Sequence, residues 1–465
     1  MGISRVLIAN RGEIAVRIIR TCRVLGIETV LAASDADKDS LGARLADRTI
    51  IIGGPNVSTY LNIPILIKTA KATGAQAIHP GYGFLSEKPE FAMACEDNGI
   101  IFIGPRAGHI HKMGNKLIAR TLAKDCGVPT LPGSEKVDSY TEIQSVADRI
   151  GYPIIIKAAA GGGGRGMKII TGDDAGSMKR IFEEASAESS AAFGDGTLYV
   201  EKYIINARHI EVQVLGDKHG GAVHLGERDC STQRRHQKLI EEAGAPDITD
   251  ALRGEIHDSA VKLVKNISYE NAGTVEFVLD QDAKKFYFLE MNTRLQVEHP
   301  VTEMITGIDI VREQINIANG GKLTFAQNDI RFTGHAIECR VNAENPSDNF
   351  RPTPGVITRW EIPQGPGVRI DTHCRHGYKV PFYYDSLIAK VIVHGDDREH
   401  ARRRMICALD EFCVEGVSTT IPFLKKTLET PEFAGGCVNT RIFEKVLTCF
   451  GGKPMVGNMP EGFRR

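Results

Sequence analysis

The stretch PIIIKAAAGGGGRGMKII, residues 153–170, places four consecutive glycines between two apolar segments. Glycine loses more backbone freedom on ordering than any other residue, so a run of four needs a reason other than packing. A flexible linker is one interpretation, but a linker is not expected between two adjoining apolar strands. A glycine-rich loop between strands can instead close its backbone N–H groups over phosphate oxygens. The pattern favours a phosphate-binding flap, to which Lys157 and Lys116 would add positive charge.

The first 114 residues, which precede this stretch, alternate strand and helix patterns. Residues 13–25 carry apolar side chains at the spacing of one helical face, and Gly26 is placed to end that helix. The segments SRVLIAN, ETVLAAS, AQAIHPGYG and GIIFIGP are typical of strands, so we expect a doubly wound, Rossmann-like parallel sheet. The first turn, ANRGEIA, lacks the GxGxxG spacing, which disfavours dinucleotide binding.

The rest of the chain predicts mixed α/β and α+β structure in further units. Residues 115–130 have a helical pattern, and residues 131–203 combine three strands with a helix near 175–191. Residues 204–330 add more strands and helices. Residues 331–450 contain the strands HAIECRVN, VITRWEI and SLIAKVIVH and a helix near 398–412.

Composition excludes several classes of protein. The 57 Lys and Arg residues nearly balance the 58 Asp and Glu residues, and the formal net charge of -1 argues against nucleic-acid binding. No apolar run approaches the roughly 20 residues of a membrane-spanning helix, so we expect no membrane insertion. The start of the chain is typical of a strand and not of a signal peptide. Ten cysteines without a CxxC pair indicate reduced thiols and a cytoplasmic protein.

Two apolar strands, GTVEFVLD and KFYFLEMN, each carry a glutamate, Glu276 and Glu290. In a hairpin symmetric about Ala283 the two carboxylates lie opposite each other, with Asn292 on the same face. Opposed carboxylates repel unless positive charge lies between them, and two carboxylates with an amide oxygen suit Mg²⁺. An exposed polar face of an edge hairpin is the alternative. The glycine stretch, which indicates a phosphate-binding flap, favours the metal site over the exposed hairpin.

The polar alternation continues beyond the hairpin. An extended chain would place Glu290, Asn292, Arg294, Gln296 and Glu298 on one face, which indicates a reaction groove or, alternatively, a solvated edge strand. His209, Glu211 and Gln213 alternate with apolar residues in the same way. The cation-rich stretch RDCSTQRRHQK, residues 228–238, is either a solvated loop or an anion site, and the sequence alone leaves both open.

Together these residues closely resemble the biotin carboxylase family, a branch of the ATP-grasp enzymes. The motifs that carry the resemblance are IANRGEIAVRI (8–18), HPGYGFLSE (79–87), ERDCSTQRRHQKLIEEAGAP (227–246), EMNTRLQVEHPVTE (290–303) and YYDSLIAKV (383–391). The resemblance implies an N-terminal domain at 1–114, a helical linker at 115–130, an ATP-grasp lid at 131–203, an ATP-grasp central domain at 204–330 and a C-terminal domain at 331–450.

The resemblance also implies roles for individual residues. The phosphates of ATP would be bound by Lys116, Lys157, Gly163 and Gly164, adenine by Glu201, Lys202 and Ile204, and the rest of the nucleotide by His209, Gln233 and His236. Glu276, Glu290 and Asn292 would hold a pair of Mg²⁺ or Mn²⁺ ions. Bicarbonate would lie against Lys238, Arg294, Gln296 and Val297, and Glu298 would remove its proton to give carboxyphosphate. Arg340 and Tyr82 would bind biotin, whose enolate Arg294 would stabilise.

The implied partners follow from a motif that this sequence does not contain. Biotin-accepting domains carry an Ala-Met-Lys-Met motif, whereas Met-Lys occurs here only at 167–168 and 178–179. We therefore expect biotin to arrive on a separate carrier protein, with a homodimeric carboxylase and a separate carboxyltransferase subunit. Two other hypotheses are another ATP-grasp ligase and a nucleotide-binding regulatory subunit. The second is disfavoured because every catalytic position of the matched motifs is filled.

Overall fold

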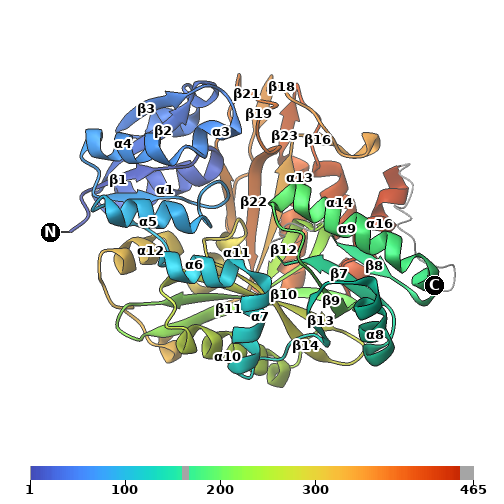
Figure 1. Ribbon diagram of the computed structural model, residues 1–465. Helices are drawn as coiled ribbons and strands as arrows, with labels where there is room; N and C mark the ends of the chain where they lie inside the picture. The colour runs from blue at the N-terminus through green and yellow to red at the C-terminus, as the bar shows by residue number, and fades with distance from the viewer. Residues whose placement is uncertain (1, 160–166, 451–465) are drawn as a thin grey trace.

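The computed structural model describes residues 2–159 and 167–450, and its N-terminal part is built on a five-stranded parallel sheet (Figure 1). The strand order is β3-β2-β1-β4-β5, with β1 at Arg5–Ile8, β2 at Glu28–Ser34, β3 at Arg48–Gly53, β4 at Ala77–His79 and β5 at Ile101–Phe102. The helices are α1 (Gly12–Val24), α2 (Leu41–Leu45), α3 (Val57–Tyr60), α4 (Ile63–Thr73), α5 (Pro89–Asp97) and α6 (Ala107–Gly114). The predicted doubly wound sheet is confirmed.

Alternation along β1 explains why helices cover both faces of this sheet. Val6 and Ile8 pack into one buried cluster with residues of α1, including Ile14. Leu7 packs into a second cluster on the other face, with Leu66 of α4 and residues of α5. Because successive side chains of a strand point to opposite faces, one short apolar strand contributes to both cores.

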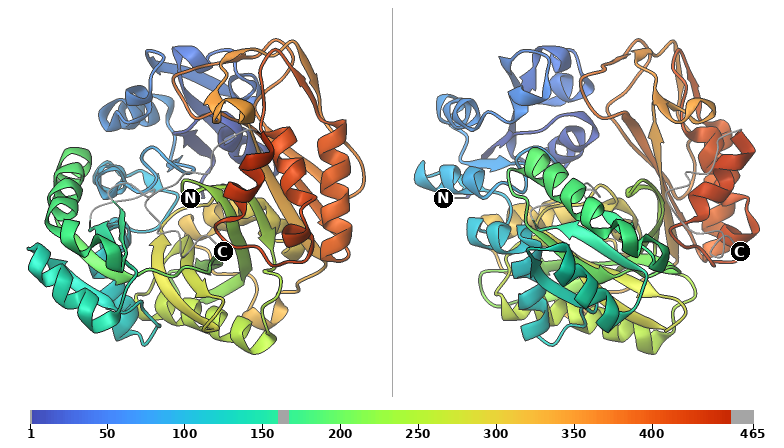
Figure 2. Two further views of the ribbon diagram at one scale, coloured as in Figure 1. Left: turned by 90° about the vertical axis from the view of Figure 1, so that its right-hand side faces the viewer. Right: turned by 45° about the vertical axis from the view of Figure 1, so that its right-hand side comes forward.

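The predicted lid contains a small antiparallel sheet of its own. Its strand order is β6-β9-β7-β8, with β6 at Gly133–Val137, β7 at Ile154–Ala158, β8 at Lys168–Ile170 and β9 at Leu198–Lys202. The helices α8 (Tyr140–Ile150) and α9 (Met178–Phe193) pack on it, and its apolar residues form a separate core. In the left view of Figure 2 this unit lies on the side of the molecule opposite the C-terminal helices. The phosphate-binding prediction for Gly163 and Gly164 lies outside the described residues.

An eight-stranded antiparallel sheet joins the central and C-terminal parts. Its order is β14-β13-β10-β11-β12-β15-β22-β20. The strands are β10 (Ala207–Gly216), β11 (Ala222–Arg234), β12 (Gln237–Ala243), β13 (Asn271–Asp280), β14 (Lys285–Asn292), β15 (His335–Asn342), β20 (Val368–Thr372) and β22 (Leu387–Gly395). Because β12 pairs with β15, the sheet continues across the predicted domain boundary at residue 330.

Helices and short strands complete the fold around this sheet. The helices are α7 (Lys116–Asp125), α10 (Asp250–Asn266), α11 (His299–Thr306), α12 (Ile310–Ala318), α13 (Arg398–Glu411), α14 (Ile421–Leu428), α15 (Pro431–Ala434) and α16 (Ile442–Leu447). The short strands are β16 (Glu344–Asn345), β17 (Arg351–Pro352), β18 (Gly355–Val356), β19 (Arg359–Glu361), β21 (Lys379–Val380) and β23 (Cys413–Glu415). Helix α7 is shorter than the predicted 115–130.

Within residues 2–159 and 167–450, none of the helices combines the length and apolarity needed to cross a membrane.

The structure decides two local questions that the sequence raised. Of the two interpretations of the cation-rich stretch, the solvated loop is wrong, because β11 and β12 form a hairpin there with Arg235 and His236 at its turn, at φ values of 47° and 66°. Positive φ at both turn residues matches the two-residue turns that fit the twist of a hairpin. The prediction of an extended polar row after Glu290 is also wrong, because β14 stops at Asn292 and Glu298 lies at the start of α11.

Candidate active site

A row of charged side chains crosses four neighbouring strands of the large sheet. Glu276 on β13 lies opposite Glu290 on β14, as the hairpin argument predicted, and opposite Glu211 on β10. Glu211 in turn lies opposite Arg228 on β11. Neighbouring carboxylates on one face repel each other, so this arrangement requires cations close by.

Lys238 on β12 supplies the central cation. Its Nζ lies 2.5 Å from Glu211 Oε2, 3.0 Å from Glu276 Oε1 and 2.6 Å from Glu298 Oε1. Burial alone would lower the pKa of Lys238, but the charges of Glu211, Glu276 and Glu298 raise it well above its usual value. Lys238 is therefore a fixed positive charge at the centre of the site. We call Lys238 and these three glutamates the Lys238 cluster.

Glu298 is fully buried and paired on both oxygens. Oε1 accepts from Lys238, and Oε2 accepts from Arg340 Nη2 at 2.8 Å. Burial would raise the pKa of Glu298, but Lys238, Arg340 and Arg228 together lower it well below its usual range. The carboxylate is therefore ionised and able to accept a proton.

Arg228 is a member of the site that was not among the predicted site residues. Its guanidinium is completely buried, with Nε 2.6 Å from Glu211 Oε1 and Nη1 2.9 Å from both Gln213 Oε1 and Thr302 Oγ1. Burial raises the pKa of Glu211, against the opposing charges of Lys238 and Arg228. The alternation of His209, Glu211 and Gln213 marked one side of this contact in the sequence.

Arg294 reaches the site through a turn. Its Nη1 donates to Gln296 Oε1 at 2.9 Å, and its Nη2 donates to Asn292 Oδ1 at 3.0 Å. Its Nε donates to Glu87 Oε2 at 2.8 Å, so the N-terminal part of the chain fixes the guanidinium. In the sequence, Glu87 stands out only as the last residue of the motif HPGYGFLSE. Asn292, Arg294 and Gln296 thus lie together as predicted. They do so because the chain bends after β14, and not because it continues as an extended strand.

The predicted metal ligands fit a divalent cation by the chemistry of their donors. Glu276 and Glu290 are opposed carboxylates, and Asn292 Nδ2 donates to Glu276 Oε1 at 2.7 Å, so all three groups lie on one face. His209 Nε2 lies 3.0 Å from Glu276 Oε2, and Lys116 Nζ lies 3.2 Å from Glu290 Oε2. Carboxylate and amide oxygens are the ligands that Mg²⁺ prefers, with phosphate oxygens and water completing the shell.

The predicted nucleotide residues lie where the lid meets the large sheet. Lys157 Nζ lies 2.7 Å from Glu201 Oε2, and Lys202 Nζ donates to the Tyr152 carbonyl at 2.7 Å. Ile204 packs against a small apolar cluster of Leu131, Ala207 and Val278. Gln233 is buried at the end of the β11–β12 hairpin, next to its turn residue His236. Burial lowers the pKa of His236, with Lys157, His209 and Lys116 adding to the effect.

The predicted biotin residues Arg340 and Tyr82 and the predicted bicarbonate residue Val297 have partners outside the Lys238 cluster. Arg340 Nε donates to Glu241 Oε1 at 2.6 Å, while its Nη2 holds Glu298. The Tyr82 hydroxyl donates to Glu13 Oε1. The Val297 carbonyl accepts from Lys390 Nζ at 2.7 Å. The partners Glu13, Glu241 and Lys390 were absent from the predicted site.

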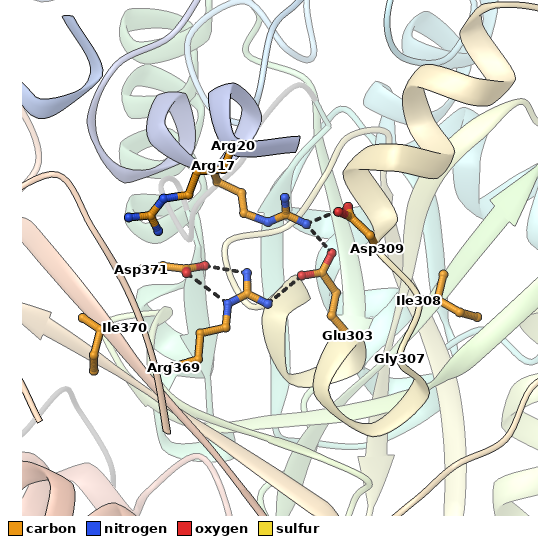
Figure 3. Close-up of a pocket in the computed structure, with 9 residues that line it drawn as sticks. All are labelled: Arg17, Arg20, Glu303, Gly307, Ile308, Asp309, Arg369, Ile370 and Asp371. Atoms are coloured by element: carbon orange, nitrogen blue, oxygen red, sulfur yellow. Dashed lines mark hydrogen bonds and ion pairs between the residues drawn. The ribbon is translucent and has the colours of Figure 1, made fainter. Parts of the chain in front are cut away.

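A separate cavity of about 370 Å³ lies between α1, β20 and the end of α11 (Figure 3). Its charges neutralise one another: Arg17 Nη2 lies 2.7 Å from both Glu303 Oε1 and Asp309 Oδ1, and Arg369 pairs with Asp371 at 2.8 Å. None of the predicted catalytic or binding residues lines this cavity.

Three family profiles match successive parts of the chain. They describe the N-terminal domain of biotin carboxylase at residues 2–110, the ATP binding domain of the carbamoyl-phosphate synthase L chain at 115–326, and the C-terminal domain of biotin carboxylase at 338–445.

Curated relatives and solved structures are similar over the whole length. Biotin carboxylase 1 of Bacillus subtilis is 51% identical over 445 residues, which cover 95% of this chain and 98% of the relative. The biotin carboxylase of Haemophilus influenzae is 51% identical over 448 residues, with coverage of 96% and 99%. The biotin carboxylase domain dimer of Hydrogenobacter thermophilus 2-oxoglutarate carboxylase, solved with MgADP, ADP and bicarbonate, has a TM-score of 0.93 and 47% identity, covering 97% of this chain and 99% of that one.

Proposed function

The chain belongs to the biotin carboxylase family, and from that premise we propose how its own residues carry out the ATP-dependent carboxylation of biotin. The reaction converts ATP, bicarbonate and biotin into ADP, phosphate and carboxybiotin, by way of carboxyphosphate. The observation that carries the assignment of residues is the Lys238 cluster, in which one largely buried cation touches three buried glutamates. Within the cluster, Glu276 also accepts from the predicted metal ligand Asn292, and Glu298 also pairs with the predicted biotin-binding Arg340.

Glu298 acts as the general base in this proposal. Bicarbonate lies against Lys238, Arg294, Gln296 and the backbone of Val297, and its proton passes to the ionised Glu298 carboxylate. The resulting oxyanion attacks the γ-phosphorus of ATP, and the bond to the ADP oxygen breaks. The pKa of Glu298 is low, but the same cations stabilise the charge that develops on bicarbonate and so ease the transfer.

The nucleotide side holds and neutralises phosphate. Glu276, Glu290 and Asn292 would bind two divalent ions, Mg²⁺ or Mn²⁺. The positive charge of these ions would neutralise the phosphate oxygens. Lys116 and Lys157, with Gly163 and Gly164, would bind phosphates. The remaining nucleotide contacts would come from Glu201, Lys202, Ile204, His209, Gln233 and His236. Phosphoryl transfer depends mostly on such positioning and charge, because there is little covalent work for the protein to do.

The biotin side receives the carboxyl group. Tyr82 and Arg340 would hold the ureido ring, and Arg294 would stabilise the enolate form that remains when the ureido N–H proton passes to the departing phosphate. The nitrogen then bonds to the carboxyl carbon as the bond between that carbon and the phosphate oxygen breaks. Arg340 also binds Glu298, so the base and the biotin-binding cation are fixed relative to each other. Carboxyphosphate is short-lived in water, and closure of the lid would protect it.

The partners belong to the proposal as well. Biotin would come on a separate carrier protein, a carboxyltransferase subunit would choose the final acceptor, and the carboxylase would be a homodimer. The ten cysteines, all free thiols in the structure, support a cytoplasmic location. If biotin is carried by a separate protein, this chain should not be biotinylated, so its intact mass should stay unchanged after treatment with an active biotin ligase.

Phosphate release by the purified chain tests the function. With MgATP, release should depend on bicarbonate and rise when free biotin is added, and labelled bicarbonate should appear in carboxybiotin. A different ATP-grasp ligase would show neither dependence. Phosphate release that is indifferent to bicarbonate, or label that never reaches biotin, would contradict the proposal.

A further inference from the structure

Lys390 is a fully buried lysine in the middle of β22. It lies opposite Arg340 on β15 and opposite Asp371 on β20, and its side chain has no exposed surface. Lysine is almost never fully buried unless its charge is paired. The contacts of Lys390 therefore show what the protein gains from placing a cation there.

The ammonium group of Lys390 contacts three different parts of the chain. Nζ donates to the Val297 carbonyl at 2.7 Å, lies 3.0 Å from Glu13 Oε1 and lies 3.9 Å from Asp371 Oδ2. Burial alone would lower the pKa of Lys390, but Glu13, Glu338 and Asp371 raise it, so the lysine keeps its charge. A charge-assisted hydrogen bond to a backbone carbonyl is a strong and directional restraint.

Two of the residues that Lys390 contacts, Val297 and Glu13, adjoin the proposed binding sites of bicarbonate and biotin. Val297 directly precedes Glu298, so the restraint on its carbonyl orients the peptide that joins them. Glu13, in the first turn of α1, accepts the hydrogen bond from the Tyr82 hydroxyl. One buried cation thus links the turn that carries the base to the acid that holds the predicted biotin-binding tyrosine.

The nucleotide side is held by other ion pairs. Lys116 pairs with Glu290, and Lys157 pairs with Glu201. These contacts involve β7, β9, β14 and the start of α7, whereas Lys390 bridges β22, α1 and the turn before α11. A change at Lys390 should therefore separate bicarbonate binding from nucleotide binding.

We propose that Lys390 is a positioning residue for the bicarbonate and biotin half of the site, acting through the Val297 carbonyl and through Glu13. The inference rests on the proposed function, which places bicarbonate at Val297 and biotin at Tyr82. Lys390 touches neither substrate; it fixes the backbone and the side chain that do.

The test uses the variant Lys390→Met combined with Glu13→Gln. Lys390→Met alone leaves Glu13 as a buried carboxylate without its cation, which destabilises the fold. Glu13→Gln removes that charge and keeps an oxygen that can accept from Tyr82. The pair Arg398→Met with Glu242→Gln is the control, because it removes another ion pair of the large sheet, one that joins the partly buried Arg398 of α13 to the buried Glu242 of β12.

The double variant at 390 and 13 should raise the KM for bicarbonate roughly tenfold or more, because the Val297 carbonyl is no longer held and the groups around bicarbonate are displaced, while the Kd for MgATP changes by less than about twofold. The control pair should leave the ratio of these two constants as in the unchanged protein. An unchanged bicarbonate KM, or an equal loss of MgATP affinity, would overturn the inference.

Glu298→Gln, assayed beside these variants, keeps the two hypotheses apart. If Glu298→Gln loses bicarbonate-dependent turnover while the double variant keeps its bicarbonate KM, Lys390 is not a positioning residue and the proposed function stands. If Glu298→Gln stays fully active, the proposed placement of bicarbonate is itself wrong, and the inference that depends on it is overturned too.

Discussion

The centre of the large sheet and the lid use the same residue types in opposite settings. In the centre, Arg228 and Glu211 form an ion pair with no exposed side-chain surface, and Lys238 joins it with only 12% of its side chain exposed. In the lid, Arg180 and Glu184 form an ion pair on α9 whose side chains are 65% and 46% exposed. The lid gains its stability from an apolar core of its own.

The difference indicates which part of the enzyme is fixed and which can move. A buried charge costs several kcal/mol unless it is fully paired, so the partners of Lys238 cannot rearrange independently. The lid sheet shares no strand with the large sheet among the described residues, and its surface ion pairs add little rigidity. The proposed chemistry thus lies in a region whose charges are fixed, and the predicted lid is a separate unit.

Glu298→Gln should produce the largest effect on activity. Glutamine keeps the shape of the side chain and removes the base, so bicarbonate-dependent ATP cleavage and biotin carboxylation should fall by about 100-fold or more. MgATP affinity should hold, because Lys116 and Lys157 lie elsewhere. Steady-state phosphate release with and without bicarbonate, beside a nucleotide titration, measures both quantities. Normal turnover in this variant would remove Glu298 from the mechanism and show that the buried cluster is purely structural.

Hydrogen exchange should separate the two regions next. Without nucleotide, amides of β6, β7 and β9 should exchange faster than those of β10 and β13. Saturation with MgATP at 100 times its Kd can raise the local opening free energy of the lid by up to about 2.7 kcal/mol. The central strands should change less, because their charges are already paired. Equal protection of the lid with and without MgATP would contradict its role as a moving cover.

The sequence predicted the parts of the site that depend on local geometry. The register of Glu276 against Glu290 follows from strand alternation and one short turn, and it is confirmed. The prediction of an extended row to Glu298 was wrong. The strand ends at Asn292, and Glu298 is the N-cap residue of helix α11, which has Pro300 in its first turn. The alternation of polar and apolar residues does not reveal this change from strand to helix. An isolated run of polar residues cannot show where its strand ends.

Partners supplied by distant parts of the chain could not be predicted. Lys390 meets Glu13 across 377 residues of sequence, and Arg294 meets Glu87 across 207. These contacts exist only once the N-terminal part and the large sheet are assembled. The resemblance to a family implied roles for the residues proposed to touch substrate but none for Arg228, Glu241 and Lys390, whose contacts hold those residues in place.

Glu338→Gln tests the cost of burying charge in the large sheet. Neither carboxylate oxygen of Glu338 has a hydrogen-bond partner among the described residues, and Glu241 lies directly opposite in register. Burial raises the pKa of Glu338 well above its usual value, and the neighbouring Glu241 adds to this; burial likewise raises the pKa of Glu241 to about 7. The folded protein therefore keeps protons that the unfolded chain releases as pH rises.

The sign of the pH effect follows from this difference in bound protons. Where the folded state binds more protons, its stability falls as pH rises above the ordinary glutamate pKa. Glu338→Gln removes one such group, so its stability relative to the unchanged protein should increase between about pH 5 and pH 8, by at most about 1.4 kcal/mol per pH unit. Thermal unfolding at both pH values measures the change. The exposed Glu183→Gln is the control, and an identical shift in both variants would count against the argument.

Arg180→Ala on the lid should have the smallest effect of all. Its partner Glu184 lies one helical turn further on, and both side chains are largely exposed, so water and salt screen the attraction. Such a pair contributes about 0.3–0.5 kcal/mol at most, and less with the cation on the N-terminal side as here. Thermal unfolding at low and high salt, together with MgATP affinity, should change little in this variant. A large loss of nucleotide affinity would show that the outer face of α9 takes part in closure, and the contrast between a rigid centre and an independently stable lid would then fail.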